Sequence, residues 1–199
     1  MKKILCMVLA LILCIGTAAL AEAVPSKTTK DLATVEAIAE SGRSILIIIY
    51  EDKASDDQLL KLQQAPTKDE YFGSIDKLDG TFVKLSELFE NEPVDVAEFA
   101  SIAVKNYEEA DGAVTAKIKF ATPYAKDEKV AVLIGLLEDG LNWRVYDGKI
   151  IDDQGTIEVV FPGDVMLKLQ ETPGFIAIAN KASAPANPFG SSNGAPGNN

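Results

Sequence analysis

The chain has 199 residues, with 19 Lys and Arg, 30 Asp and Glu and no histidine, which gives a net charge of −11 at pH 7. Without histidine, Ser-His-Asp and Cys-His catalysis are excluded, together with the zinc sites that histidine usually completes. An acidic chain without clustered basic residues is also poorly suited to nucleic acid or anionic lipid, so we expect no nucleic acid among its partners.

The first 21 residues are predicted to be a secretory signal peptide. Lys2 and Lys3 precede an apolar run from residue 4 to about residue 15, and small residues then lead to an A-x-A site at residues 19–21. The apolar run is too short and wrongly flanked for a stable membrane span. The sequence therefore predicts a secreted or extracellular protein, with or without attachment to the cell surface, and no membrane span in its mature form.

The mature protein is expected to begin at Glu22. Both cysteines, Cys6 and Cys14, precede this residue, so no disulfide is expected and the core alone must stabilise the fold. The mature chain keeps 17 basic and 30 acidic residues, a net charge of −13. An alternative makes Cys14 a lipid-modified first residue, but Leu13 is bulky where such cleavage boxes take a small residue.

The first elements of the mature chain fit a β-hairpin. DLATVEAIA, residues 31–39, has apolar residues at both helical and strand spacing. The turn at Ser41 and Gly42 and the β-branched run SILIIIYE, residues 44–51, favour two antiparallel strands. Because the second run is almost wholly apolar, we expect it to be buried on both faces.

Two short helices are expected after the hairpin. Ser55 and Gln58 form a capping-box pattern before a leucine-rich segment that ends at Pro66. Apolar residues then recur at helical spacing up to Pro93, at Phe82, Leu85, Leu88 and Phe89. We predict a small α+β subdomain over residues 24–93.

The second half changes to the period of β-strands. Six runs alternate or are rich in β-branched residues, at residues 99–107, 114–120, 130–137, 142–146, 156–161 and 175–179. Turn residues separate them, which is typical of a two-layer antiparallel sandwich. The overall prediction is an α+β chain with an immunoglobulin-like β-sandwich domain over residues 94–182.

One segment of the second half is helical instead. FPGDVMLKLQ, residues 161–170, is expected to cross the end of the sandwich, with Asp164 as the N-cap. Val165, Met166 and Leu169 would then close the core, and Gly174 would let the chain re-enter the sheet. The last segment, residues 183–199, has no charged residue and many Gly, Pro, Asn and Ser, so it is predicted to be a flexible tail.

Three stretches carry a resemblance to known proteins: VPSKTTKDL, NYEEADGAVTAKIKFATPY, and the final W-x-V…DG…G-T-I-E-V-x-F…F-I-A-I pattern. Together they resemble uncharacterised secreted proteins of anaerobic Gram-positive bacteria. The resemblance implies an immunoglobulin-like sandwich half, although the paired cysteines and the corner tyrosine of antibody domains are absent. It carries no functional residue.

The candidate sites involve carboxylates and aromatic rings. A glycosidase needs only two acids, and seven lie near predicted turns: Glu108, Glu109, Asp111, Glu138, Asp139, Asp152 and Asp153. Calcium is the one possible cofactor, because Asp147, Asp152 and Asp153 could converge on a metal, although no D-x-D-x-D-G spacing supports this. Asp is also common in turns for backbone reasons, so a solvated-turn interpretation of all these acids stays open.

Trp143, Tyr146 and Tyr124 are the candidate ligand-binding residues, because exposed rings can stack on a sugar. If Trp143 faces inward, it is an anchor of the core instead. We favour a secreted, non-enzymatic binding protein at the bacterial cell surface, whose ligand is a protein or a glycan of the envelope. The alternatives are a carboxylate-dependent glycoside hydrolase or related polysaccharide-acting enzyme, and a chaperone or inhibitor with an unpaired strand edge.

Overall fold

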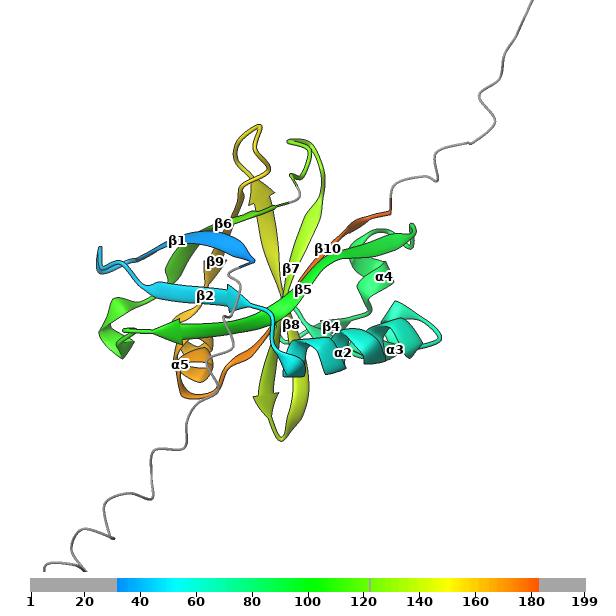
Figure 1. Cartoon of the computed structure of the whole chain (residues 1–199), viewed down its shortest axis with the longest axis horizontal. Helices are drawn as coiled ribbons and strands as arrows, with labels where there is room; N and C mark the ends of the chain where they lie inside the picture. Colours follow the sequence, from blue (N-terminus) through cyan, green and yellow to red (C-terminus); the bar gives the residue numbers. More distant parts are fainter. Residues whose placement is uncertain (1–31, 122, 183–199) are drawn as a thin grey trace, which may run out of the picture.

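The computed structural model describes residues 32–121 and 123–182 (Figure 1). The predicted signal peptide at residues 1–21, the alternative at Cys14 and the predicted tail at residues 183–199 lie outside these ranges. Within the described ranges, no helix has the length and apolar character that crossing a membrane requires.

Antiparallel strands dominate the structure. They are β1 (Ala33–Ala39), β2 (Leu46–Tyr50), β3 (Ile75–Asp76), β4 (Phe82–Val83), β5 (Val94–Lys105), β6 (Val114–Phe120), β7 (Val130–Glu138), β8 (Gly140–Ile150), β9 (Ile157–Phe161) and β10 (Gly174–Lys181). Eight of them follow the order β1-β6-β9-β8-β7-β10-β5-β2, and the short hairpin β3–β4 is attached to β8.

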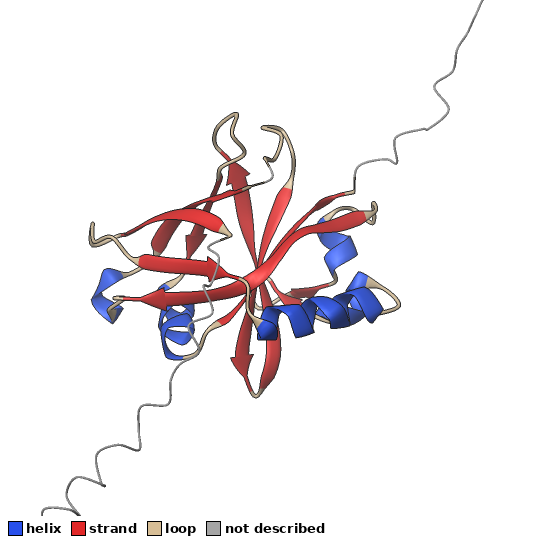
Figure 2. Cartoon of the chain, in the orientation of Figure 1, coloured by secondary structure: helices blue, strands red, loops and turns tan. Residues whose placement is uncertain are grey.

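The eight strands form two layers that join into a nearly closed ring. One layer contains β8, β7, β10, β5 and β2, and the other contains β1, β6 and β9. On one side β8 passes from the first layer to the second, and on the other side an isolated bridge between Ile38 and Ser44 joins β1 to β2. This mostly antiparallel sheet with a few helices agrees with the predicted α+β class, in a sandwich or barrel-like arrangement (Figure 2).

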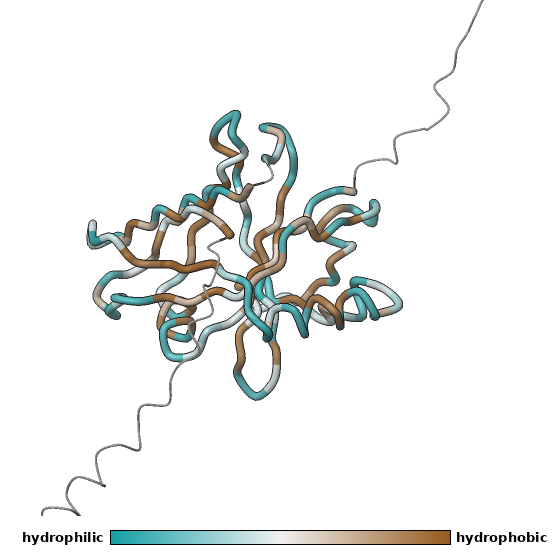
Figure 3. Tube along the Cα trace, viewed as in Figure 1, coloured by the Kyte–Doolittle hydropathy of each residue, from teal (hydrophilic) through white to brown (hydrophobic). Residues whose placement is uncertain are grey.

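The interior of the ring is an apolar core built by strand alternation. In β6, Val114, Ala116, Ile118 and Phe120 are buried, while the residues between them face outward, as predicted. The turns at the periphery are largely hydrophilic, whereas much of the path of the central strands is hydrophobic (Figure 3).

The outer face of the smaller layer is exposed and carries mostly polar side chains, with Ile38 and Val160 as apolar exceptions. One row of side chains crosses four strands with alternating charge, from Glu36 in β1 to Lys117 in β6, Glu158 in β9 and Lys149 in β8. Opposite charges at directly paired positions on neighbouring strands stabilise a sheet by roughly 0.2–1 kcal/mol per pair. Charged side chains of this kind are stable in water, and the helices of the described ranges that pack on a sheet face lie over the larger layer instead.

Helices cover the outer face of the larger layer and form a second core there. They are α2 (Lys53–Gln64), α3 (Lys68–Phe72) and α4 (Leu85–Leu88). Trp143 lies beneath them, with its ring centroid 4.9 Å from that of Phe72 and 5.9 Å from that of Phe99. As a result, the central strands β7 and β10 are buried on both faces.

Three local predictions in the first half are wrong. The second strand of the hairpin, β2, is not buried on both faces: Ile47 and Ile49 point into the core, but Leu46 is 48 % exposed because the helices lie over β7, β10 and β5 instead.

Helix α2 begins after Asp52, whose carboxylate accepts a hydrogen bond from the Ser55 amide (2.8 Å), so Ser55 is the third helical residue and not the N-cap. Phe82 belongs to strand β4 and is 66 % exposed, so only one helical turn, α4, follows it.

Helix α5 (Gly163–Glu171) closes one end of the ring. Val165, Met166 and Leu169 are fully buried, as predicted. The predicted N-cap at Asp164 is wrong, because Pro162 occupies that position and Asp164 lies in the first turn. After α5 the chain passes so close to β7 that a Cβ at Gly174 would lie 2.3 Å from the Gly135 carbonyl oxygen, which explains the glycine.

The predicted boundary near Pro93 falls immediately before β5. Strands β1 and β2 precede this boundary, and they pair with β6 and β5, which follow it. Both halves of the chain therefore contribute strands to the same ring.

The plug formed by α5 can be tested by stability measurements. Leu169→Ala removes a fully buried side chain and should lower the free energy of unfolding by about 2–5 kcal/mol in urea denaturation. Leu60→Ala, on the exposed face of α2, is the matched control and should change it by less than about 0.5 kcal/mol. Equal losses for the two variants would contradict the role of α5.

Candidate functional site

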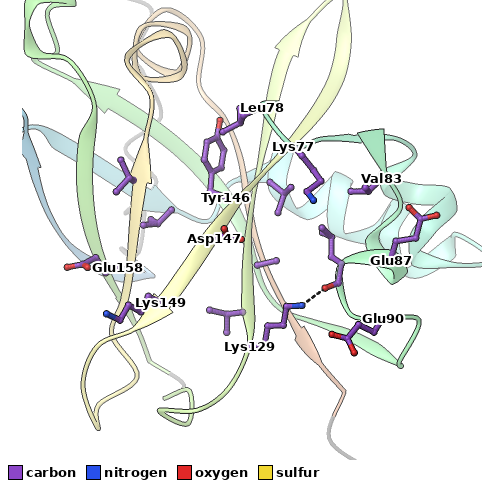
Figure 4. A pocket seen from close by; sticks show the side chains of 16 residues that line it. Lys77, Leu78, Val83, Glu87, Glu90, Lys129, Tyr146, Asp147, Lys149 and Glu158 are labelled. Atoms are coloured by element: carbon purple, nitrogen blue, oxygen red, sulfur yellow. Dashed lines mark hydrogen bonds between the residues drawn. The ribbon is translucent and has the colours of Figure 1, made fainter. Parts of the chain in front are cut away.

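A groove of about 680 Å³ lies beside the corner where β8 leaves the larger layer (Figure 4). Its lining comes from β7, β8, β9, the turn between β3 and β4, and the segment around α4. The side chains include three lysines, four acids and several aliphatic residues.

The corner is open because β8 and β9 pair over a very short length. Only Lys149 with Glu158 and Ile150 with Ile157 are paired between them. From there β9 continues along β6, while β8 continues along β7. A strand that changes sheets in this way forms the corner of a sandwich, and the two neighbours diverge on either side of it.

Strand β3 occupies part of the edge that β9 leaves free. Asp76 pairs with Arg144 in parallel orientation, and the chain then turns back through Lys77 to Thr81 into β4. Ala131 and Val145, both buried, lie between this hairpin and β9 and form an apolar floor.

The turn between β3 and β4 is held in a defined shape. The Lys77 amide donates to the Thr81 carbonyl (3.0 Å), and the Leu78 amide donates to the Asp76 carboxylate (2.8 Å). Leu78 has a φ of +70° and an exposed side chain at the rim of the groove. A hydrogen bond from the Thr81 hydroxyl to the Asp79 carboxylate lowers the pKa of Asp79.

The charged residues of the groove are of both signs: Lys77, Lys129 and Lys149, and Glu87, Glu90, Asp147 and Glu158. Lys129 has a structural contact, because its Nζ donates to the Leu88 carbonyl (2.7 Å) and lies 5.6 Å from the centre of the Phe89 ring. It thereby ties β7 to the wall formed by α4, as Figure 4 shows.

Arg144 anchors the β3 hairpin and α5 to β8. Its Nη1 donates to Asp164 (2.7 Å), and its Nε lies 3.7 Å from an oxygen of Asp76. Burial disfavours the charge of Arg144, but the bond to Asp164 and the nearby Tyr146 hydroxyl outweigh it and raise the pKa of Arg144. Burial is also the main cause that raises the pKa of Tyr146.

The three predicted aromatic residues lie in two different cores. Trp143 is buried under the helices, whereas Tyr146 and Tyr124 are buried inside the ring. Burial raises the pKa of Tyr124 as well. Tyr146 also contributes to the lining of the groove, but the structure does not bring the three rings together on an open surface. The core-anchor interpretation of Trp143 agrees with its burial.

The three predicted metal ligands also lie in different surroundings. Asp147 is exposed in the groove, while Asp152 accepts hydrogen bonds from the amides of Thr156 (3.0 Å) and Gln154 (2.9 Å) within a turn. The bond from Thr156 is the main cause that lowers the pKa of Asp152. Asp153 is exposed and lies 3.9 Å from the ammonium of Lys126. Among the described residues, no three His, Cys, Asp or Glu side chains are grouped to hold a metal ion.

Of the seven acids considered for catalysis, only Asp111 is buried, with 1 % exposed, and the others are exposed or half-exposed. Its carboxylate accepts hydrogen bonds from the Ser41 hydroxyl (2.7 Å), the Glu108 amide (2.8 Å) and Arg43 Nη1 (3.1 Å). These contacts fasten the β1–β2 turn to the 3₁₀ turn at residues 109–111, so the role of Asp111 is structural.

Sequence reasoning missed most of the groove. It singled out Tyr146 and Asp147 but not Lys77, Glu87 or Glu90, which come from the first half of the chain. The available signal was the turn pattern at residues 79–80, which indicates a hairpin with an exposed tip. That the tip lies against β8 follows from tertiary pairing alone.

Comparison with known proteins identifies no relative: no protein-family model, no curated protein and no solved structure matches this chain.

The contacts of Asp111 predict a specific dependence of stability on pH. The hydrogen bond from Ser41 is the largest cause that lowers the pKa of Asp111 below its ordinary value of 3.8, while burial acts in the opposite direction. Because the folded-state pKa is the lower one, the stabilisation is present above pH 3.8 and is lost as the pH falls through the folded-state pKa.

Asp111→Asn should therefore lower the free energy of unfolding at neutral pH. As the pH falls into the acid range, the free energy of unfolding of this variant should decrease less than that of the wild type, as measured by urea denaturation. Asp153→Asn is the control, because Asp153 is exposed, and it should keep the wild-type pH dependence. An unchanged acid profile for Asp111→Asn would contradict this assignment.

Proposed function

We propose that the protein is a secreted, non-enzymatic binding protein of the bacterial cell surface, and that its ligand contacts the groove between β9 and the β3–β4 hairpin. The observation that carries this proposal is the groove itself: an open channel with a small apolar floor and exposed charges of both signs along its rim. Such a surface suits recognition of a polar ligand with some apolar side groups.

The arrangement of acids favours binding over hydrolysis. Glu87, Glu90 and Asp147 are exposed, and only Glu158 is half-buried. A general acid for glycoside cleavage needs burial or a neighbouring acid to hold its proton near neutral pH. Three of the four acids of the groove lie on its exposed rim and not across a closed cleft, so the groove favours binding over the hydrolase alternative.

Other parts of the proposal rest on the sequence. Secretion rests on the charge, apolar run and A-x-A order of residues 1–21, and kinship with secreted proteins of anaerobic Gram-positive bacteria rests on the quoted segments. The immunoglobulin-like assignment is supported by two antiparallel layers with crossover connections. These features are compatible with either a protein or a glycan of the cell envelope as the ligand.

The proposal predicts that binding depends on the groove. The labelled full chain is tested against a glycan array and against separated envelope proteins, with and without calcium. Asp147→Arg and Val160→Asp alter two exposed groove positions and should weaken binding at least about tenfold, which corresponds to roughly 1.4 kcal/mol.

Thr34→Arg is the matched control for this measurement, because Thr34 is exposed on β1, outside the groove. It should leave binding unchanged, and all variants should keep the wild-type melting temperature. Ligand binding that survives both groove substitutions would refute the proposed site, and polysaccharide cleavage abolished by Glu158→Gln would favour the hydrolase.

A further inference from the structure

We propose that the groove takes an extended polypeptide segment, which adds as a strand in the open corner between β8 and β9. This inference rests on the proposed function, because it names the class of ligand for the same site. It is carried by the direction of the main-chain groups at the corner, by the apolar surface beside them and by the distribution of charge.

The pairing of β8 with β9 defines which main-chain groups face the corner. At the end of the hairpin, the Ile151 amide donates to the Thr156 carbonyl (3.0 Å). In an antiparallel pair, hydrogen-bonded and non-bonded residue pairs alternate. Lys149 and Glu158, two residues further along each strand, are partners in register and, by this alternation, form the next bonded pair.

The same alternation makes Asp147 and Val160 the next bonded pair in register, yet the ladder between β8 and β9 ends before them. By this alternation, their N–H and C=O groups would be directed into the corner where the two strands diverge. β3 does not occupy this position, because its pairing with β8 is at Arg144. Asp147 and Val160 both line the groove and both residues are exposed, which places this part of each strand within reach of a ligand.

An inserted strand would satisfy main-chain groups on both sides of the corner. This is the mode in which a peptide gains affinity from main-chain hydrogen bonds and specificity from alternate side chains. Val160, which is 54 % exposed, and the exposed Leu78 offer apolar contacts at the rim, and Ala131 leaves room at the floor.

The side chains of the groove favour a polypeptide over a polysaccharide. Lysines and acids occur together: Lys77 lies on the side of Glu87 and Glu90, and Lys149 lies beside Glu158 on the opposite side of the groove. Such a rim pairs with a segment that has charged residues of both signs, whereas an anionic polymer would meet four acids. A sugar ring needs an exposed aromatic face, and the aromatic residue of the lining, Tyr146, is buried.

The test uses a displayed library of random peptides about twelve residues long, selected on the full chain, followed by amide hydrogen exchange with the best peptide. The expected result is a slowing of exchange by at least about tenfold at the amides of Asp147 and Val160. Methylation of single peptide amides should weaken binding at every second position, because alternate amides of a strand face the same edge.

Val160→Lys should weaken the selected peptide at least about tenfold, and Thr34→Lys should not, while both keep the wild-type melting temperature. The inference would be overturned if Val160→Lys weakened the binding of no selected peptide. It would also be overturned if the peptide left the exchange rates of the Asp147 and Val160 amides unchanged. A glycan that binds and depends on the groove would also overturn it, yet would leave the proposed function intact. If no ligand is weakened by substitutions in the groove, both the strand-addition inference and the proposed function are rejected.

Discussion

The structure depends on the path of one strand, β8, which belongs to both layers. Over residues 140–148 it pairs with β7, and at residues 149–150 it pairs with β9. This crossing lets the apolar side chains of both layers face a single interior, which helix α5 then closes at one end. A strand that changes partners has to part from its neighbour, and the groove lies where β8 and β9 diverge.

The two faces of the sheet explain where helices lie and where they do not. β7 and β10 carry apolar residues on both faces, so a second core forms beneath α2, α3 and α4. The smaller layer alternates apolar and charged residues, and its outer row of opposite charges is stable in water. The groove lies on the border between these two surfaces, which is why it combines an apolar floor with a charged rim.

Fixed polar contacts hold the parts that surround this border. Arg144 joins β8 to Asp76 of the hairpin and to Asp164 of α5, so the hairpin wall and the plug share one anchor. Asp111 performs the corresponding role at the β1–β2 turn. Buried or half-buried charges of this kind persist only when paired, and their pairing gives the ring defined edges.

The sequence by itself determined the strands of the second half, the two strands of the first and the apolar face of α5, because period-two alternation and helical spacing are local properties. The main partners of β1 and β2 are β6 and β5, and only an isolated bridge joins the two strands to each other. It did not identify β4 or the true N-cap of α2, since short elements depend on a partner or on one hydrogen bond. Only the tertiary structure decided which apolar run is buried on both faces, since that depends on where the helices pack. The groove is also a tertiary feature, because Lys77, Asp147 and Val160 come from distant parts of the chain and meet only through the divergence of β8 and β9.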